Sequence, residues 1–159
     1  KRNHIARFID NNNWRYERIT EQNIEDCVRM SRDWSHKNGV IDDIDKQNEY
    51  YAVSIALENF FALDFFGGIL RVDDKVVAYT VGERLSEDTM IVHIEKAYHD
   101  IQGAYPMINR EFVRDYGGAF TYVNREEDMG SEGLRKAKLS YYPDILYVKI
   151  RAAEVGSVR

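Results

Sequence analysis

The feature of this sequence that most constrains the fold is a change in hydrophobic period at Phe65. Upstream of it, apolar residues recur at helical spacing, whereas from residue 67 to residue 97 they alternate with polar ones. Alternation with a period of two is typical of strands, and turn residues at 73–74 and 86–88 interrupt it twice. The sequence therefore predicts a three-stranded antiparallel meander over residues 67–72, 75–84 and 89–97.

Helices and further strands are predicted on both sides of this meander. The other strands are expected at 14–19, 119–123 and 145–150, and the helices are expected to end at Asn38-Gly39, near Phe60, at Gly117-Gly118 and at Tyr142. Strands that are separated by a helix pair in parallel or lie apart. The expected fold class is therefore α+β, with a mixed sheet of about six strands and helices on both faces.

Length and composition favour one globular domain. The chain has 159 residues, of which 44% are hydrophobic, and a net charge of −5 gives no support for a general nucleic-acid-binding surface. Cys27 is the single cysteine, so it is expected in the core, and a reducing cytoplasm is the expected compartment. No run of eighteen apolar residues is present, so no membrane-spanning segment is predicted.

An acidic cluster at Asp42, Asp43 and Asp45 allows two interpretations. Its D-x-D spacing suits a cation, but no loop glycine or distal glutamate completes an EF-hand. Acidic residues also cap helices and favour the positive end of the helix dipole. We take the cluster as a helix start and expect no metal site.

Charged and small residues follow residue 123, between a predicted strand and a predicted helix. If the strand continued, Asn124 and Glu126 would share a face with the aromatic residues before them. An amide and a carboxylate would then lie on the face on which the sheet buries aromatic rings. Ligands bind beyond the carboxyl ends of strands, so we predict that Asn124, Arg125, Glu126 and Asp128 meet substrate. Arg125 either anchors a phosphate or carboxylate, or pairs with Glu127 or Asp128. The alternative is a solvated loop.

His93 and Glu95 are the second candidate pair. Both are predicted on one face of the strand over residues 89–97, so their side chains are expected to point together. A histidine of near-neutral pKa, or a glutamate whose pKa is raised by burial, suits a general base. The alternative is a histidine that is hydrogen-bonded beneath a helix.

Basic residues of the next predicted helix are candidates for phosphate recognition. Lys136 lies one turn from Ser140, and Arg135 and Lys138 form another basic edge, although a solvated helix face is the ordinary interpretation. Tyr141 has core spacing unless its hydroxyl reaches the site. Asn109, in the preceding helix, is a further candidate for substrate binding.

Four motifs add a specific resemblance to this pattern. They are His93-x-Glu95-Lys96-Ala97, Gly103-x-Tyr105-Pro106-x-Ile108-Asn109-x-Glu111-Phe112, Val123-Asn124-Arg125-Glu126-Glu127-Asp128-x-Gly130 and Gly133-Leu134-Arg135-Lys136-Ala137-Lys138-x-Ser140-Tyr141-x-Pro143. They resemble a family of bacterial proteins grouped with the C-terminal domain of phosphatidylglycerol lysyltransferase. That family resembles tandem GNAT acyltransferase modules and is related to the peptidoglycan Fem transferases.

The resemblance implies a GNAT-like domain over residues 14–151. Residues 1–13 would be a linker or connecting helix from an N-terminal GNAT-like module, and residues 152–159 a C-terminal tail. In a GNAT-like sheet, His93 and Glu95 would lie at the end of the fourth strand, where a general base is often held. Residues 124–128 would lie across a cleft from them. The implied partners are the N-terminal module, a small-molecule, lipid or peptide acceptor, and tRNA.

One departure from the GNAT pattern concerns the acyl donor. GNAT enzymes that use acetyl-CoA carry Gln/Arg-x-x-Gly-x-Gly/Ala after the fourth strand, and its backbone amides hold the pyrophosphate at a helix N-terminus. This chain has Gln102-Gly103-Ala104-Tyr105-Pro106, which offers fewer free N–H groups. Acyl-CoA and aminoacyl-tRNA are both expected donors at this point.

The sequence therefore predicts an acyl- or aminoacyl-transferase module. His93 or Glu126 would be the base, with Glu95 in the same catalytic group, and Asn124 or backbone amides would stabilise the oxyanion. The alternative is a non-catalytic half of a tandem protein that binds a ligand or docks against its twin. A sensor of a small amine or nucleotide is a third possibility.

Overall fold

The structure is a computed structural model that describes residues 1–39, 43–150 and 152. The chain divides into two compact units, residues 1–127 and residues 128–159, each of which is described here by itself. Neither unit contains, among the described residues, a helix long and apolar enough to cross a bilayer.

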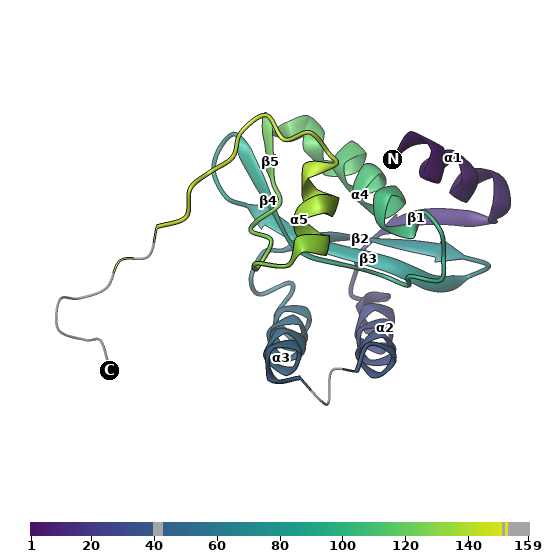
Figure 1. Ribbon diagram of the computed structural model, residues 1–159. Helices are drawn as coiled ribbons and strands as arrows, with labels where there is room; N and C mark the ends of the chain where they lie inside the picture. Colours follow the sequence, from purple (N-terminus) through teal and green to yellow (C-terminus); the bar gives the residue numbers. More distant parts are fainter. Residues whose placement is uncertain (40–42, 151, 153–159) are drawn as a thin grey trace. The chain divides into compact units, whose positions relative to one another are not determined.

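The first unit is built on a five-stranded sheet in the order β1-β2-β3-β4-β5 (Figure 1). The first three pairs are antiparallel, and β4 and β5 are parallel. The predicted meander is confirmed as β2, β3 and β4. The strands are β1 (Trp14–Arg18), β2 (Phe66–Val72), β3 (Lys75–Arg84), β4 (Thr89–Ala97) and β5 (Tyr122–Asn124).

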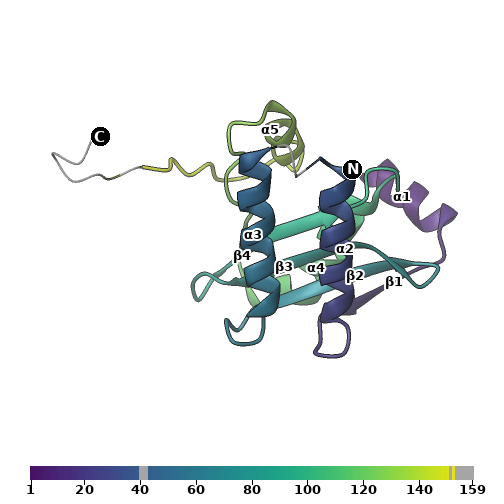
Figure 2. The same ribbon diagram turned by 90° about the horizontal axis from the view of Figure 1, so that it is seen from below.

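Helices cover both faces of the sheet. On one face, α2 (Ile24–Lys37) and α3 (Ile44–Glu58) lie side by side, as Figure 2 shows, and α1 (Arg2–Asn11) and α4 (Ala104–Tyr116) lie on the other. Cys27 of α2 is fully buried in the first of these layers, and Phe8 of α1 in the second. The predicted fold class, a mixed α+β sheet with helices on both faces, is confirmed.

The acidic cluster starts a helix. The Asp43 side chain accepts hydrogen bonds from the backbone N–H groups of Asp45 and Lys46 in the first turn of α3. Asp42 lies outside the described residues. Within the described part of the chain, no group of three or more histidine, cysteine, aspartate or glutamate side chains is arranged to hold a metal ion.

A β-bulge interrupts β4 at His93. Thr80 to Val81 of β3 pair with Glu95 to Ile94, but Gly82 pairs with Val92, so His93 is an extra residue without a partner in the register. The Thr80 hydroxyl donates to the Ile94 carbonyl at 2.9 Å. A Cβ at Gly82 would lie closer than 3.0 Å to the carbonyl oxygen of Ile91. Thr80 therefore hydrogen-bonds to the β4 backbone next to the bulge, and the absence of a side chain at Gly82 allows that backbone to approach β3 closely.

The bulge changes which face the β4 side chains occupy. Before it, Met90 and Val92 pack with Phe112 of α4. After it, Ile94 packs in the cluster that α2 and α3 cover. Residues two apart in a regular strand share a face, so the extra residue reverses the alternation.

Two predicted strands differ from the structure. The segment expected at 119–123 begins as a 3-10 turn at Gly117–Ala119, and β5 is a three-residue edge strand in which Tyr122 is 46% exposed rather than buried. Residues 145–150 are irregular, with Tyr147 and Val148 each 86% exposed. A strand needs a partner for its ladder, and no described strand pairs with this segment.

The second unit contains the helix α5 (Glu132–Leu139), which ends before the predicted Tyr142. Ser131 caps it by accepting from the Leu134 backbone N–H. Asp128 pairs with Arg135 at 2.5 Å and accepts from the Gly130 backbone N–H at 3.0 Å. Of the predicted tail, only residue 152 is described.

Candidate active site

The centre of the candidate site is His93, whose two ring nitrogens each meet a glutamate. Nδ1 lies 2.6 Å from Oε1 of Glu126, and Nε2 lies 2.9 Å from Oε1 of Glu83. The three side chains are 28%, 39% and 36% exposed, respectively, so a solute can reach them. A carboxylate only accepts hydrogen bonds, so with both glutamates ionised each ring nitrogen donates and the ring is an imidazolium.

These contacts raise the pKa of His93. Burial by itself lowers that pKa, but the hydrogen bonds and negative charges of Glu83 and Glu126 outweigh burial. The pKa therefore lies above the ordinary 6.5. The group holds a proton at neutral pH more readily than a free histidine does.

Glu95 belongs to a second, buried group on the face that α4 covers. Nη2 of Arg125 lies 2.9 Å from both carboxylate oxygens of Glu95, and Nδ2 of Asn109 in α4 donates to Glu95 at 3.3 Å. Burial raises the pKa of Glu95, against the effects of Arg125 and Asn109, which favour the carboxylate. Arg125 therefore pairs with the carboxylate of Glu95, a partner that the sequence did not predict.

The prediction that His93 and Glu95 point together is wrong. Glu95 contacts α4, whereas His93 lies 5.7 Å, centroid to centroid, from the ring of Phe65, which packs against the cluster beneath α2 and α3. The cause is the β4 bulge, which puts these two residues on opposite faces of the sheet. The expected cleft between His93 and residue 126 is also closed, since their side chains touch.

Asn124 shapes the backbone after β5. Its side-chain oxygen accepts from the Glu126 backbone N–H at 2.8 Å, which makes an Asx turn. Glu126 has φ +55°, in the left-handed region that a residue with a side chain adopts uncommonly. Asn124 is therefore placed to orient Glu126, and its predicted role at an oxyanion stays a prediction.

The remaining predicted substrate-binding residues lie in the second unit. Asp128 is engaged with Arg135 in the turn before α5, Lys136 is exposed on that helix, and Lys138 and Tyr141 are half-buried. Their part in substrate binding stays a prediction.

Sequence reasoning missed Glu83. A signal was present, because Tyr79 and Val81 alternate on the β3 face that α2 and α3 cover, and Glu83 continues that series with a carboxylate. The contact between Glu83 and His93 could not be predicted, because regular alternation in β4 gives no reason to place His93 on the face that α2 and α3 cover.

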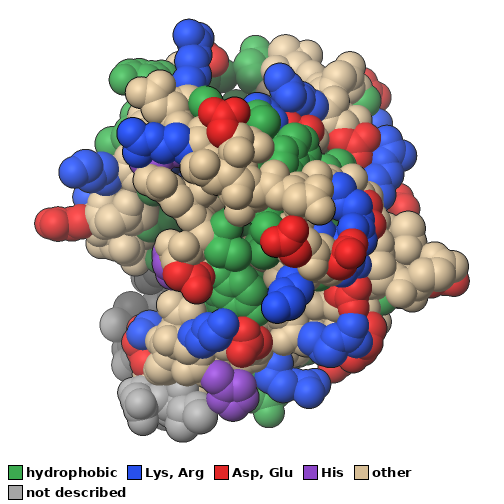
Figure 3. All heavy atoms as spheres, turned by 90° about the vertical axis from the view of Figure 1, so that its right-hand side faces the viewer, with side chains coloured by type: hydrophobic (Ala, Val, Ile, Leu, Met, Phe, Trp, Pro, Cys, Tyr) green, Lys and Arg blue, Asp and Glu red, His purple; other side chains and the backbone are tan. Residues whose placement is uncertain are grey.

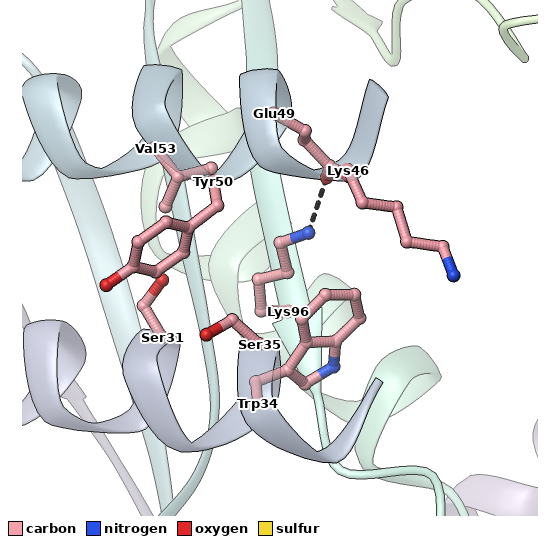
Figure 4. Close-up of a pocket in the computed structure, with 8 residues that line it drawn as sticks. All are labelled: Ser31, Trp34, Ser35, Lys46, Glu49, Tyr50, Val53 and Lys96. Carbon is pink, nitrogen blue, oxygen red and sulfur yellow. Dashed lines mark hydrogen bonds and ion pairs between the residues drawn. The ribbon is translucent and has the colours of Figure 1, made fainter. Parts of the chain in front are cut away.

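A small hollow lies between α2 and α3, and His93 is not among the residues that line it (Figure 4). Lys96 points there toward Glu49, with which it forms an ion pair, and its Nζ lies 3.9 Å from the centroid of the Trp34 ring. The volume open to the centre of a water-sized molecule is about 10 Å³, room for about one water. The hollow is therefore too small for a substrate.

The start of α4 does not fit a CoA pyrophosphate held in the GNAT manner. A Cβ at Gly103 would lie 2.5 Å from the His4 carbonyl oxygen and 3.0 Å from Cβ of Phe8, so α1 covers this end of the helix. The backbone N–H of Ala104 is already bonded to the Ile101 carbonyl, and Pro106 has none. Few donors remain for an anion.

Charge on the surface is mixed. Acidic and basic side chains are interspersed over the face that Figure 3 shows. In the first unit, Arg18 pairs with Asp115 at 2.6 Å and Arg71 with Asp26 at 2.5 Å. Nucleic-acid binding draws on positive charge that can neutralise phosphates, so these paired arginines add little to it.

Comparison with known proteins assigns the family. The family described as phosphatidylglycerol lysyltransferase, C-terminal, matches residues 1–152. The chain belongs to this family. No curated protein matches the chain significantly.

Solved structures agree with the family and the fold. A conserved protein of unknown function from Bacteroides thetaiotaomicron VPI-5482 is 44% identical, with a TM-score of 0.87 over 91% of this chain and 49% of that one. This chain thus spans about half the length of that relative. An aminoglycoside acetyltransferase from a soil metagenome, in complex with sisomicin, has a TM-score of 0.61 at 14% identity, covering 92% of this chain and 98% of that one.

Another neighbour is the AAC(6')-Iy enzyme in complex with a CoA bisubstrate analogue. It has a TM-score of 0.53 at 6% identity and covers 87% of this chain and 99% of that chain. At these identities the acetyltransferase neighbours show the fold, which is that of the GNAT acyltransferases.

Proposed function

We propose that this chain is an acyltransferase module that moves an aminoacyl group to a hydroxyl or amine acceptor. The observation that carries the proposal is the exposed Glu83–His93–Glu126 group, which lies beside the parallel β4 and β5 pair. Acyl transfer needs a group that takes the acceptor's proton as its oxygen or nitrogen attacks, and a histidine between carboxylates suits that step.

The reaction has a simple proton balance. The acceptor oxygen or nitrogen forms a bond to the carbonyl carbon of the donor and gives up one proton to His93 or Glu126. The ester or thioester bond to the leaving group then breaks, and the same proton passes to the leaving oxygen or sulfur. His93 can accept a proton only while its ring is neutral. Because its pKa is raised, the ring is protonated at low pH, and this route is slow there.

Aminoacyl-tRNA is the donor we favour over acyl-CoA. The family name points to a lysyl group as the cargo and phosphatidylglycerol as the acceptor. The covered N-terminus of α4 supports the choice, since it leaves little room for the pyrophosphate of CoA. Within the second unit, Lys136 and Lys138 of α5 are the residues we propose for phosphate contact.

The test is a transfer assay on the full chain with radiolabelled lysyl-tRNA and phosphatidylglycerol vesicles, run beside acetyl-CoA. We expect lipid-linked label from lysyl-tRNA, and a loss of at least about tenfold in rate for His93→Ala and Glu126→Gln. Glu58→Gln makes the same chemical change on an exposed part of α3 and is expected to leave the rate unchanged. Wild-type rates in both site variants would contradict the roles given to His93 and Glu126.

A specific observation favours a second function, that of a non-catalytic half of a longer protein. The candidate side chains are already occupied by one another, and the chain spans about half of its 44% identical relative. A module of this kind would bind a ligand or dock against its twin. Transfer activity that resides wholly in the other half of a full-length relative, with no loss on changing His93 here, would support it.

A further inference from the structure

Two neighbouring residues after β5 reach opposite faces of the sheet. Arg125 contacts Glu95 on the α4 face, with Nη2 2.9 Å from each carboxylate oxygen. Glu126 contacts His93 on the other face at 2.6 Å. The β4 bulge makes this possible, because it turns His93 and Glu95 to opposite sides. The chain after β5 is therefore attached to β4 from both faces.

The sheet ladder itself does not hold these residues. β5 pairs with β4 at three positions only, and the last pair is Ile91 with Asn124. Glu126 also has a left-handed backbone, φ +55°, a conformation that persists only where its surroundings support it. The Asn124 turn and the contact of Arg125 with Glu95 both lie within two residues of Glu126 along the chain.

The two attachments differ in exposure. The side chains of Arg125 and Glu95 are 21% and 13% exposed, and Asn109, which donates to Glu95, is 7% exposed. The side chains of His93 and Glu126 are 28% and 39% exposed. The buried contact is shielded from water and the accessible one meets solutes, which suggests a division between support and chemistry.

We propose that Glu95 and Arg125 are a positioning pair that holds Glu126 against His93. In this role neither residue takes part in the proton transfer itself. The catalytic consequence rests on the proposed function, whereas the effect on the His93–Glu126 contact does not depend on it. This role replaces the catalytic role that the sequence predicted for Glu95.

The readout is the pKa of His93, measured by NMR titration of its ring protons in the whole chain. Glu95→Gln combined with Arg125→Met removes both charges and leaves no buried charge alone. We expect a fall of about half a unit to one unit, equal to the fall in Glu126→Gln. In a Glu126→Gln background, the same pair of changes is expected to have no further effect, because the contact is already lost.

A matched control removes the neighbouring ion pair. Lys96 follows Glu95 in β4 and forms an ion pair with Glu49 of α3. The double change Lys96→Met and Glu49→Gln removes both of these charges without altering residue 126, and is expected to leave the pKa of His93 unchanged. Arg125→Lys restores the charge and is expected to return the pKa toward its wild-type value. If the Gln/Met variant does not fold, Arg125→Met alone serves, since buried Glu95 can then take up a proton.

The proposal would be overturned if the pKa of His93 were unchanged in a folded variant that carries Glu95→Gln and Arg125→Met, or in a folded Arg125→Met variant. Glu95 and Arg125 would then form a structural ion pair only. Transfer activity separates the two proposals. If the wild-type chain transfers nothing but the pKa falls as expected, the positioning role stands and the proposed function fails. If the proposed function and the positioning role both hold, we expect kcat of the variant with Glu95→Gln and Arg125→Met to fall about tenfold or more, with little change in KM.

Discussion

Gly82 of β3 offers the sharpest structural test, because the bulged β4 leaves no space for a side chain there. A Cβ at this position would lie closer than 3.0 Å to the Ile91 carbonyl oxygen, a separation that real Cβ atoms essentially never show, and 3.2 Å from Cζ of Phe112. The first obstacle is backbone in a central strand, which cannot rotate away as a flexible side chain does. Gly82→Ala therefore forces β3 and β4 apart.

The expected cost follows from two opposing terms. Overpacking a well-packed core costs about 1–3 kcal/mol. Replacing glycine by alanine stabilises by about 0.4–1 kcal/mol through the unfolded chain. Taking the middle of each range, about 2 and about 0.7 kcal/mol, the net expectation is a loss of about 1.3 kcal/mol, which lowers Tm by roughly 3–5 °C in a chain of this size.

Urea denaturation with a thermal melt measures this loss. Gly118→Ala is the matched control, because no heavy atom lies within 4 Å of the Cβ position there. It is expected to be neutral or slightly stabilising. Equal stability of the Gly82 and Gly118 variants would refute the account of the bulge given above.

Three further predictions concern the site and its surroundings. First, the pKa of His93 is raised, so its contacts contribute stability that is fully present below about pH 6.5 and lost as pH rises through the folded-state pKa. Transfer rate should rise with pH through that same pKa, and Glu126→Gln should move the rise to lower pH by about half a unit to one unit; a pH–rate profile unaffected by this change would contradict it. Second, Phe8→Ala should cost about 3–5 kcal/mol in urea unfolding, because Phe8 is fully buried against α4; a loss below about 1 kcal/mol would mean that α1 is only loosely attached. Third, acetyl-CoA should give no saturable heat in calorimetry, whereas micromolar binding would show that α1 leaves the start of α4.

Much of the fold is readable from the sequence because its signals are local. Period-two alternation marks β2, β3 and β4, and glycine and asparagine mark the helix ends. The strand expected at 145–150 illustrates the limit. Its residues have strand propensity, but a strand forms only with a partner, and no local pattern states which edge that partner offers.

The site is less readable because it depends on one non-local feature. Four of the predicted residues make contacts between β4 and the end of β5, but as two separate pairs, His93 with Glu126 and Glu95 with Arg125, and their functional roles stay predictions. Their pairing was not predicted, because a single extra residue in β4 exchanges the two faces and brings Glu83 to His93. Alternation alone carries no sign of that extra residue.

The packing of α1 against the start of α4 also bears on how such modules can be cut and joined. Residues 1–13 look like a linker by composition, yet Phe8 fills the same core layer as Ala104 and Ile108. A recombination event at the Asn11–Asn13 run would leave an apolar hole on one partner and an unsupported helix on the other. The segment that must be kept together on recombination therefore includes α1. Exchange of modules between relatives is expected to keep α1 and α4 in the same piece.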